Sequence, residues 1–343
     1  MRKLLNVLYV TTEDAYASLD GENIVLSQGK TILGRFPLHI LEGIYLFTYA
    51  GASPRLIAKC CDTDIDLVQC SPAGKFLARP CGRTRGNVLL RREQYRIADD
   101  SYRSCLISRN MIYGKILNEK HVLDRMVRDH KDRVPVEELT KASAMLMQAG
   151  KQVLSITEND ALRGLEGSAA SVYFDSFDQL ILKDKGNFYF QGRTRRPPLD
   201  RINALLSYVY MMLTNMCASA LESVGLDPYV GFMHTDRSGR VSLALDLVEE
   251  FRPCLADRFV LSLVNNGIVK ADDFEIQADG AVLIKEKGRK ILQQAWQKRK
   301  AEKIMHPYLK ESVEWGLLPY VQSMLLARMI RKDIDGYPSF IWR

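Results

Sequence analysis

Long apolar runs and paired cysteines are both missing from this sequence of 343 residues. It has no stretch of about 18 uncharged apolar residues, and its opening segment reaches Glu13 and Asp14 before a cleavable signal pattern is complete. The seven cysteines are odd in number and contain no C-x-x-C pair, which argues against a structural zinc site or a redox motif. We therefore expect a cytoplasmic protein that makes no membrane contact and whose thiols are free and mostly buried.

Two common catalytic motifs are also absent. Residues 29–31 (GKT) resemble the end of a phosphate-binding loop, but the glycine that should open this loop falls at Ile24. None of the five histidines belongs to an H-E-x-x-H motif, which argues against a zinc protease of that type. We expect no ATP binding at residues 29–31 and no nucleotide hydrolysis.

The composition is that of an ordinary globular protein, with 47% hydrophobic and 26% charged residues. At 343 residues the chain is longer than a domain with one hydrophobic core usually is, and the pattern of apolar residues changes along it. Residues 1–90 carry short β-type runs between turn signals, whereas apolar residues at helical spacing dominate 91–343. This pattern predicts an α+β protein, with a small N-terminal β domain followed by a larger, mostly α-helical domain. The GRTRG segment at 82–86 suits an exposed connector.

One carboxylate stands out in the stretch NDALRGLEGSAASVYFDSFDQL, which predicts a helix from Asn159 or Asp160 to about residue 182. At about 100° per residue, Glu166 shares its face with apolar residues. Burying an unpaired charge is costly, so Glu166 needs a cation, a hydrogen-bond donor or a metal. An ordinary salt bridge to Arg163, one turn earlier, is the alternative to a metal.

A second group of candidate ligands lies in GFMHTDRSGRVSLALDLVEEFRP. His234 precedes a turn, and a helix is expected to begin near Ser242 and to end or bend at Pro253. Asp246 lies three residues before Glu249 and four before Glu250, so two carboxylates can share a face toward His234. A solvated helix end and a surface histidine are the alternative interpretation.

Two carboxylates and one imidazole can form a three-ligand site with open positions for water and phosphate oxygens. One nitrogen with hard oxygens suits Mn²⁺ or Mg²⁺ better than structural zinc. Metal-assisted phosphodiester chemistry needs a site of this kind.

These motifs resemble the CRISPR-associated integrase and endonuclease of the adaptation step, the Cas-one family. That family has a helical Glu, then a Gly-Phe-x-His segment, then an acidic pair in a helix that ends near Phe-Arg-Pro. Here they read LRGLEGSAASVYF, GFMHTDRSGR and DLVEEFRP, and RTRRPPLDRINALLSYVY resembles the linker into the central helix. The resemblance covers nearly the whole chain, and the terminal PSFIWR resembles the subtype I-C branch.

The resemblance implies that Glu166, His234 and Glu249 are the metal ligands and catalytic residues. Glu249 stands where the family commonly has Asp, one methylene shorter, and Asp246 is then a second carboxylate that binds through water or orients His234. Arg163 is a further candidate for such a supporting role.

The resemblance also implies a homodimer bridged by a small CRISPR-associated partner, Cas-two, in a heterohexamer that acts on DNA. The net charge of +7 favours polyanion partners. The basic side chains that suit phosphate contacts are Arg193, Arg195, Arg196, Lys298, Arg299 and Lys300. A 3′-hydroxyl of the incoming fragment would attack a phosphodiester at the repeat boundary, with metal activation. The alternatives are a non-catalytic DNA-bridging protein and a general metal-dependent nuclease.

Overall fold

The computed structural model describes residues 6–41, 43–63, 65–72, 76–80, 82 and 87–342. The chain divides into two compact units. The first is built from residues 1–85, 272–275 and 283–302, and the second from residues 86–271, 276–282 and 303–343. An N-terminal β region is followed by a mostly helical region, as the α+β prediction requires.

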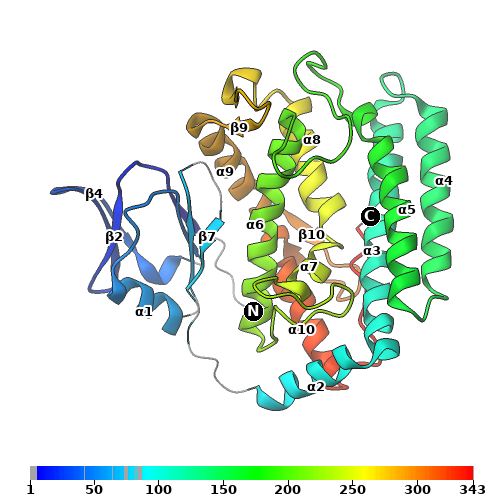
Figure 1. Cartoon of the computed structure of the whole chain (residues 1–343), viewed down its shortest axis with the longest axis horizontal. Coiled ribbons are helices and arrows are strands. Elements are labelled where there is room, and N and C mark those ends of the chain that lie inside the picture. The colour runs from blue at the N-terminus through cyan, green and yellow to red at the C-terminus, as the bar shows by residue number, and fades with distance from the viewer. Residues whose placement is uncertain are drawn as a thin grey trace. The chain divides into compact units, whose positions relative to one another are not determined.

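The first unit contains two sheets (Figure 1). The four-stranded sheet has the order β1 (Val7–Val10), β5 (Gly43–Leu46), β6 (Asp66–Cys70) and β7 (Phe76–Ala78). Strands β1, β5 and β6 are parallel, and β7 is antiparallel to β6. The antiparallel three-stranded sheet consists of β2 (Tyr16–Asp20), β3 (Asn23–Gln28) and β4 (Thr31–Pro37).

Short helical segments connect these strands. The 3₁₀ turn η1 (Leu38–Ile40) follows β4, and helix α1 (Pro54–Asp62) connects β5 to β6. Helix α1 begins where the Ser53 hydroxyl accepts a hydrogen bond from the Leu56 N–H (3.2 Å) and Pro54 occupies the first turn. Ile24, Leu46 and Leu56 are fully buried in the apolar core that the sheets and α1 share.

Helix α9 (Glu286–Ala301) belongs to the first unit, although its sequence lies far beyond residue 90. Its Leu292 and Trp296 are buried, and the Gln297 amide donates to the carbonyl of Val7 on β1 (3.2 Å). The predicted division of the chain at residue 90 is therefore too simple, because residues 283–302 also belong to the first unit. Of the predicted connector at 82–86, only Gly82 lies among the described residues.

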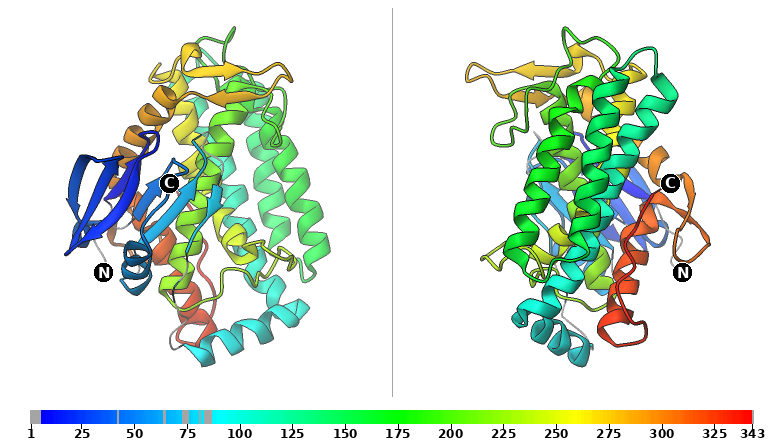
Figure 2. Two further views of the ribbon diagram at one scale, coloured as in Figure 1. Left: turned by 60° about the vertical axis from the view of Figure 1, so that its left-hand side comes forward. Right: turned by 90° about the vertical axis from the view of Figure 1, so that its right-hand side faces the viewer.

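The second unit is built mainly from helices (Figures 1 and 2). They are α2 (Val88–Asp99), α3 (Ser101–His130), α4 (Val136–Val153), α5 (Asn159–Asp175), α6 (Arg201–Ser223), α7 (Ser242–Val248), α8 (Arg258–Asn265) and α10 (Leu318–Ile330). The long helix α3 packs against α4 and α5, and α6 packs against α7 and α10. Helix α3 thereby lies next to both segments that the sequence marked as candidate ligand carriers.

Shorter elements complete the description. They are the turns η2 (Phe177–Leu180), η4 (Ala271–Asp273) and η5 (Trp315–Leu317), the π-helical segment η3 (Arg252–Asp257), and the strand pairs β8 (Phe274–Ile276) with β9 (Val282–Ile284) and β10 (Lys303–Met305) with β11 (Ser312–Glu314). Helix α5 ends at Asp175 and η2 follows, so the prediction of one helix to residue 182 was too long. Helix α7 begins at Ser242 as predicted, and Pro253 lies in η3, where the helix changes form.

Helix α6 is long and apolar enough to cross a membrane by length and composition, with 67% of its apolar window buried inside the protein. Such burial is typical of a core helix in a globular protein. None of the six described cysteines forms a disulfide with another described residue and five of the six are buried, whereas Cys81 lies outside the described residues.

Candidate metal centre

Asp246 on α7 organises the loop that carries His234. Its Oδ2 accepts hydrogen bonds from the backbone N–H groups of Phe232 (2.6 Å) and Met233 (3.0 Å). Its Oδ1 lies 3.0 Å from the backbone nitrogen of His234 and 2.6 Å from Nδ1 of the same residue. A carboxylate that accepts from Nδ1 leaves Nε2 of the imidazole as the acceptor, which is the arrangement found behind metal-binding histidines.

The same loop approaches α7 too closely for a side chain at Gly231. A Cβ there would lie 2.8 Å from the His234 carbonyl oxygen and 2.9 Å from Asp246 Oδ2. Glycine is therefore required for the backbone N–H groups to reach the Asp246 carboxylate.

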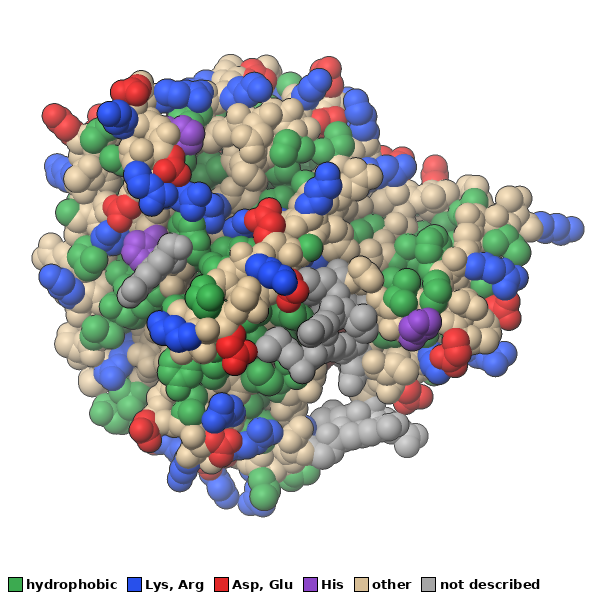
Figure 3. All heavy atoms as spheres, turned by 180° about the vertical axis from the view of Figure 1, so that it is seen from behind, with side chains coloured by type: hydrophobic (Ala, Val, Ile, Leu, Met, Phe, Trp, Pro, Cys, Tyr) green, Lys and Arg blue, Asp and Glu red, His purple; other side chains and the backbone are tan. Residues whose placement is uncertain are grey.

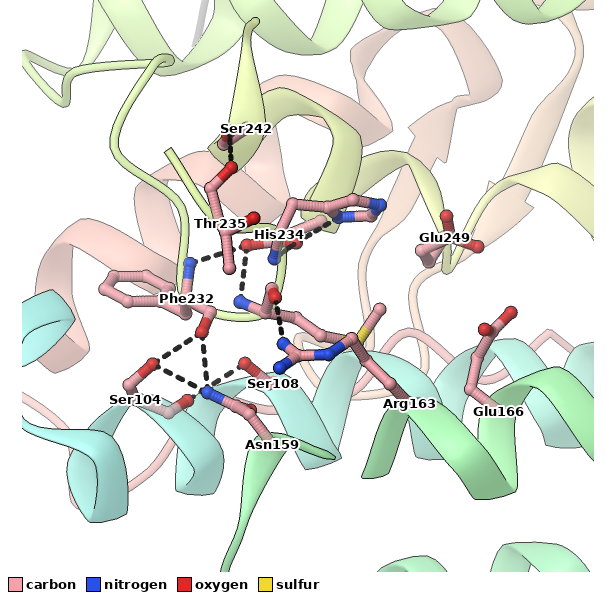
Figure 4. A network of polar contacts seen from close by, with 12 residues as sticks. Ser104, Ser108, Asn159, Arg163, Glu166, Phe232, His234, Thr235, Ser242 and Glu249 are labelled. Carbon is pink, nitrogen blue, oxygen red and sulfur yellow. Dashed lines mark hydrogen bonds and ion pairs between the residues drawn. The ribbon is translucent and has the colours of Figure 1, made fainter. Parts of the chain in front are cut away.

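Helices α3 and α5 hold the other side of the His234 loop (Figure 4). The carbonyl of Phe232 accepts from Ser104 Oγ on α3 (2.5 Å) and from Asn159 Nδ2 on α5 (2.8 Å). Arg163 Nη1 donates to the Met233 carbonyl (2.8 Å), and its Nη2 pairs with Asp160. Arg163 thus supports the loop, and its carboxylate partner is Asp160 rather than Glu166, the partner that the salt-bridge alternative required.

Glu166 and Glu249 share a cation that the sequence analysis missed. The ammonium of Lys115, on α3, pairs with Glu166 Oε1 and lies 2.8 Å from Glu249 Oε2. The side chains of Lys115 and Glu249 are only 5% and 3% exposed, whereas that of Glu166 is 20% exposed. A signal for Lys115 existed in the sequence, since it is a single charge within the apolar stretch MIYGKIL. The structure therefore brings two of the three predicted ligands to one buried cation.

Arg252 supplies a second positive charge to Glu249, with 2.6 Å between Nη1 and Oε1. Burial opposes ionisation of Glu249, but the charges of Arg252 and Lys115 outweigh it and lower the pKa to about 2. Arg252 also lies 5.1 Å from the ring of Tyr210, whose hydroxyl donates to Asp257 (2.5 Å). Glu249 is therefore held as an anion at neutral pH.

Glu250 faces away from this centre. Its Oε2 accepts from Gln322 Nε2 and from the Tyr337 hydroxyl, each at 2.9 Å. Burial raises its pKa to about 8, so at neutral pH Glu250 is mostly uncharged. The adjacent residues 249 and 250 thus have different roles, because a rotation of about 100° directs them to different surroundings.

The donor set suits a hard divalent cation. Two carboxylates and an imidazole with a fixed Nδ1 contact provide oxygen and nitrogen ligands, and a cation already lies between the carboxylates. Figure 4 shows Glu249 beyond the outer edge of the His234 ring and Glu166 on the neighbouring helix. As these side chains stand, no three His, Cys, Asp or Glu residues in the described part of the chain gather closely enough to hold a metal. The residue types are those that such an ion prefers, and the Lys115 ammonium lies between the two carboxylates.

The RTRR segment contains one structural arginine and two exposed ones. Arg193 donates to Asn203 Oδ1 (2.7 Å) and Ser207 Oγ (3.1 Å), and it stacks 5.3 Å from the Tyr210 ring. These contacts fasten the segment to α6, and a phosphate contact by Arg193 stays a prediction. Arg195 and Arg196 are exposed.

The basic end of α9 is similarly divided. Lys298 is exposed, Arg299 pairs with Glu302, and Lys300 is only 2% exposed. Burial removes Lys300 from the candidate phosphate contacts, which corrects that prediction. Figure 3 shows Lys and Arg side chains interspersed with Asp and Glu on the face that it views, so the charge of +7 is not collected there.

Known proteins resemble this chain over its full length. A family model described as "CRISPR associated protein Cas1" matches residues 8–298. A protein from Chlorobaculum tepidum named "CRISPR-associated endonuclease Cas1 1" is 46% identical over 343 residues, with 100% of both chains covered. A protein from Rhodospirillum rubrum named "CRISPR-associated endonuclease Cas1 2" is 45% identical over 350 residues, again with 100% of both chains covered.

Solved structures share the fold at lower identity. A casposase bound to an integration product superposes with a TM-score of 0.83 at 21% identity, covering 97% of this chain and 94% of that one. A CAS1 protein from Thermotoga maritima gives a TM-score of 0.80 at 21% identity, covering 98% and 100%. A chain of a Cas6-RT-Cas1–Cas2 complex also gives 0.80 at 21% identity, covering 98% of this chain and 36% of that one.

Proposed function

Because this chain belongs to the CRISPR-associated Cas1 family, we propose that it is a metal-dependent DNA endonuclease and integrase that inserts short DNA fragments into a CRISPR array. The observation that carries the proposal is the centre where Glu166 and Glu249 share a buried cation and Asp246 orients His234. The names of the two relatives, both endonucleases, support the same activity.

Glu166, Glu249 and His234 Nε2 would hold the metal, for which we propose Mg²⁺ or Mn²⁺. When bound, this ion supplies activation of the attacking 3′-hydroxyl and neutralises charge on the phosphate and the leaving oxygen. Asp246 keeps the imidazole in the tautomer that presents Nε2, and Arg252 keeps Glu249 ionised. One phosphodiester forms as another breaks, so the reaction needs no ATP.

For assembly we infer that two homodimers bind one dimer of the small partner Cas2, forming a heterohexamer on DNA in the cytoplasm. The first unit, which contains the N-terminal β region, would provide dimer and partner contacts, and the mostly helical second unit would provide the catalytic domain. Support comes from the likeness to a chain in a Cas1–Cas2 complex. The terminal PSFIWR segment supports placement in subtype I-C.

The deciding experiment is an integration assay with purified protein, Cas2, Mn²⁺, a labelled DNA fragment and a supercoiled plasmid that carries the repeat. We expect covalent joining of label at the repeat boundary. Binding without a covalent product would favour a non-catalytic bridging protein. Degradation of the DNA without joined ends would favour a general metal-dependent nuclease.

DNA affinity should depend steeply on salt, because the exposed Arg195 and Arg196 would each release a counterion on binding phosphate. We expect the Arg195→Ala/Arg196→Ala double variant to reduce the log-log salt slope by about 0.9 for each phosphate that the protein no longer neutralises. The measurement is fluorescence anisotropy over a salt series. Lys185→Ala, which removes an exposed lysine paired with Asp178, is the control and should keep the wild-type slope. An unchanged slope in the double variant would show that the RTRR arginines are only a solvated surface.

A further inference from the structure

Lys115 lies between Glu166 and Glu249, two of the three proposed metal ligands. Its ammonium contacts one carboxylate oxygen from each residue, and its side chain is 5% exposed. Lys115 is not one of the predicted metal ligands, none of which lies on helix α3. A buried ammonium between two carboxylates neutralises them when no other cation does.

A divalent cation and Lys115 would compete for the same oxygens. Both cannot hold Glu249 Oε2 closely, since like charges a few ångströms apart repel strongly in a buried site. Metal binding at Glu166 and Glu249 therefore requires the ammonium to withdraw, and a withdrawn ammonium needs another partner because an unpaired buried charge is costly.

Glu119 offers that partner. It follows Lys115 by four residues on α3, a spacing that places both side chains on one face of the helix. It is buried at 1% exposure, and its Oε2 has no hydrogen-bond partner among the described residues. Burial raises the pKa of Glu119 to about 8, and the positive charge of Lys115 opposes that rise.

We propose that Lys115 is a built-in counter-ion for the metal centre. Its ammonium holds Glu166 and Glu249 together when no metal is bound, and it moves to pair with Glu119 when a divalent cation binds. This inference rests on the proposed function of the centre. It makes Lys115 and Glu119 positioning residues that set metal affinity, and neither is itself a ligand.

The proposal and a purely structural role predict opposite signs for Lys115→Met. If Lys115 only maintains the fold, its loss disorders the site and weakens Mn²⁺ binding. If it competes with the metal, its loss tightens Mn²⁺ binding by about tenfold or more, because a unit charge beside the ion is removed. The metal-free variant should also melt at a lower temperature than wild type, since two buried carboxylates lose their cation.

The test is a double-mutant cycle read out as Mn²⁺ affinity by isothermal titration calorimetry of the full chain. We expect Lys115→Met to bind more tightly and Glu119→Gln to bind severalfold more weakly, because Lys115 then has nowhere to move. The double variant should match Lys115→Met, since Glu119 acts only through Lys115. Lys115→Arg should bind Mn²⁺ about as wild type does. Lys120→Met, which removes a charge on the same helix that pairs with Asp124, is the matched control.

Several outcomes would overturn the inference. Weaker Mn²⁺ binding by a folded Lys115→Met protein would do so, as would a Glu119→Gln effect that persists without Lys115. If Lys115→Met does not fold, wild-type affinity in Glu119→Gln alone is enough to reject the transfer step. A different result would reject the proposed metal-dependent function itself, namely equal Mn²⁺ affinity in wild type and Glu166→Gln.

Discussion

Purified protein carrying Glu166→Gln or His234→Ala should join no DNA fragment to the repeat, while still binding the fragment nearly as well as wild type. Both side chains are proposed metal ligands, whereas the proposed phosphate contacts are exposed basic side chains elsewhere on the protein. A catalytic metal contributes several kcal/mol of charge stabilisation, and each factor of ten in rate corresponds to about 1.4 kcal/mol. We therefore expect joining to fall by about a thousandfold or more. The measurements are the plasmid integration assay with Mn²⁺ and fragment binding by anisotropy.

Matched variants separate chemistry from folding. Glu158→Gln makes the same substitution at the exposed N-terminal cap of α5, and His130→Ala removes a histidine at the end of α3. Both should join DNA at the wild-type rate. Normal joining by Glu166→Gln or by His234→Ala would remove that residue from the centre, and loss of fragment binding in both would point to a folding defect.

Local sequence patterns predicted much of the fold. Alternating apolar runs and turn signals indicated the N-terminal strands, and helical periodicity indicated the helices after residue 90. The sequence did not show that α9 rejoins the first unit, because the hydrogen bond between Gln297 and Val7 joins residues nearly three hundred positions apart. The sequence analysis missed helix α1, although Ser53-Pro54 is a recognisable start signal, because this helix is short and lies between β-type runs.

The sequence predicts which side chains share a face when they lie on one helix. It does not predict which side chains meet when their helices are far apart in the sequence. Helix phase shows that Glu249 and Glu250 cannot both face one ion, and the resemblance selects Glu249, together with Glu166 and His234. Lys115 could not be paired with either glutamate from sequence, because α3, α5 and α7 meet only in the folded protein. Similarly, a list of charges does not show burial, so Arg193 and Lys300 resembled the exposed Arg195 and Lys298.

The three acidic residues at the end of α7 have surroundings that predict three different outcomes. Glu249 contacts Lys115 and Arg252 and is ionised, with its pKa lowered to about 2. Asp246 accepts from three backbone N–H groups as well as contacting the His234 ring. Glu250 lies in a neutral, buried hydrogen-bond network.

Replacing each with its amide tests these assignments at nearly constant volume. Glu249→Gln should eliminate integration, because it removes a charged ligand. Asp246→Asn should reduce integration strongly and lower the melting temperature, since an amide NH₂ would face backbone donors, and each unsatisfied buried group costs about 1–3 kcal/mol. Glu250→Gln should join DNA at close to the wild-type rate, because burial already raises the pKa of Glu250 to about 8 and the amide resembles the neutral acid.

Integration rates and thermal unfolding of the three amide variants, measured side by side at pH 7, give the ranking. This pH is below the pKa of Glu250, about 8, so that side chain is mostly protonated. It is far above the pKa of Glu249, about 2, so that side chain is ionised. The substitution at Glu249 therefore removes a charge, and the one at Glu250 largely does not. An inactive Glu250→Gln protein together with an active Glu249→Gln protein would mean that the functional carboxylate is one position later on the helix. The centre would then have to be rebuilt around Gln322 and Tyr337, the partners of Glu250, instead of Lys115 and Arg252.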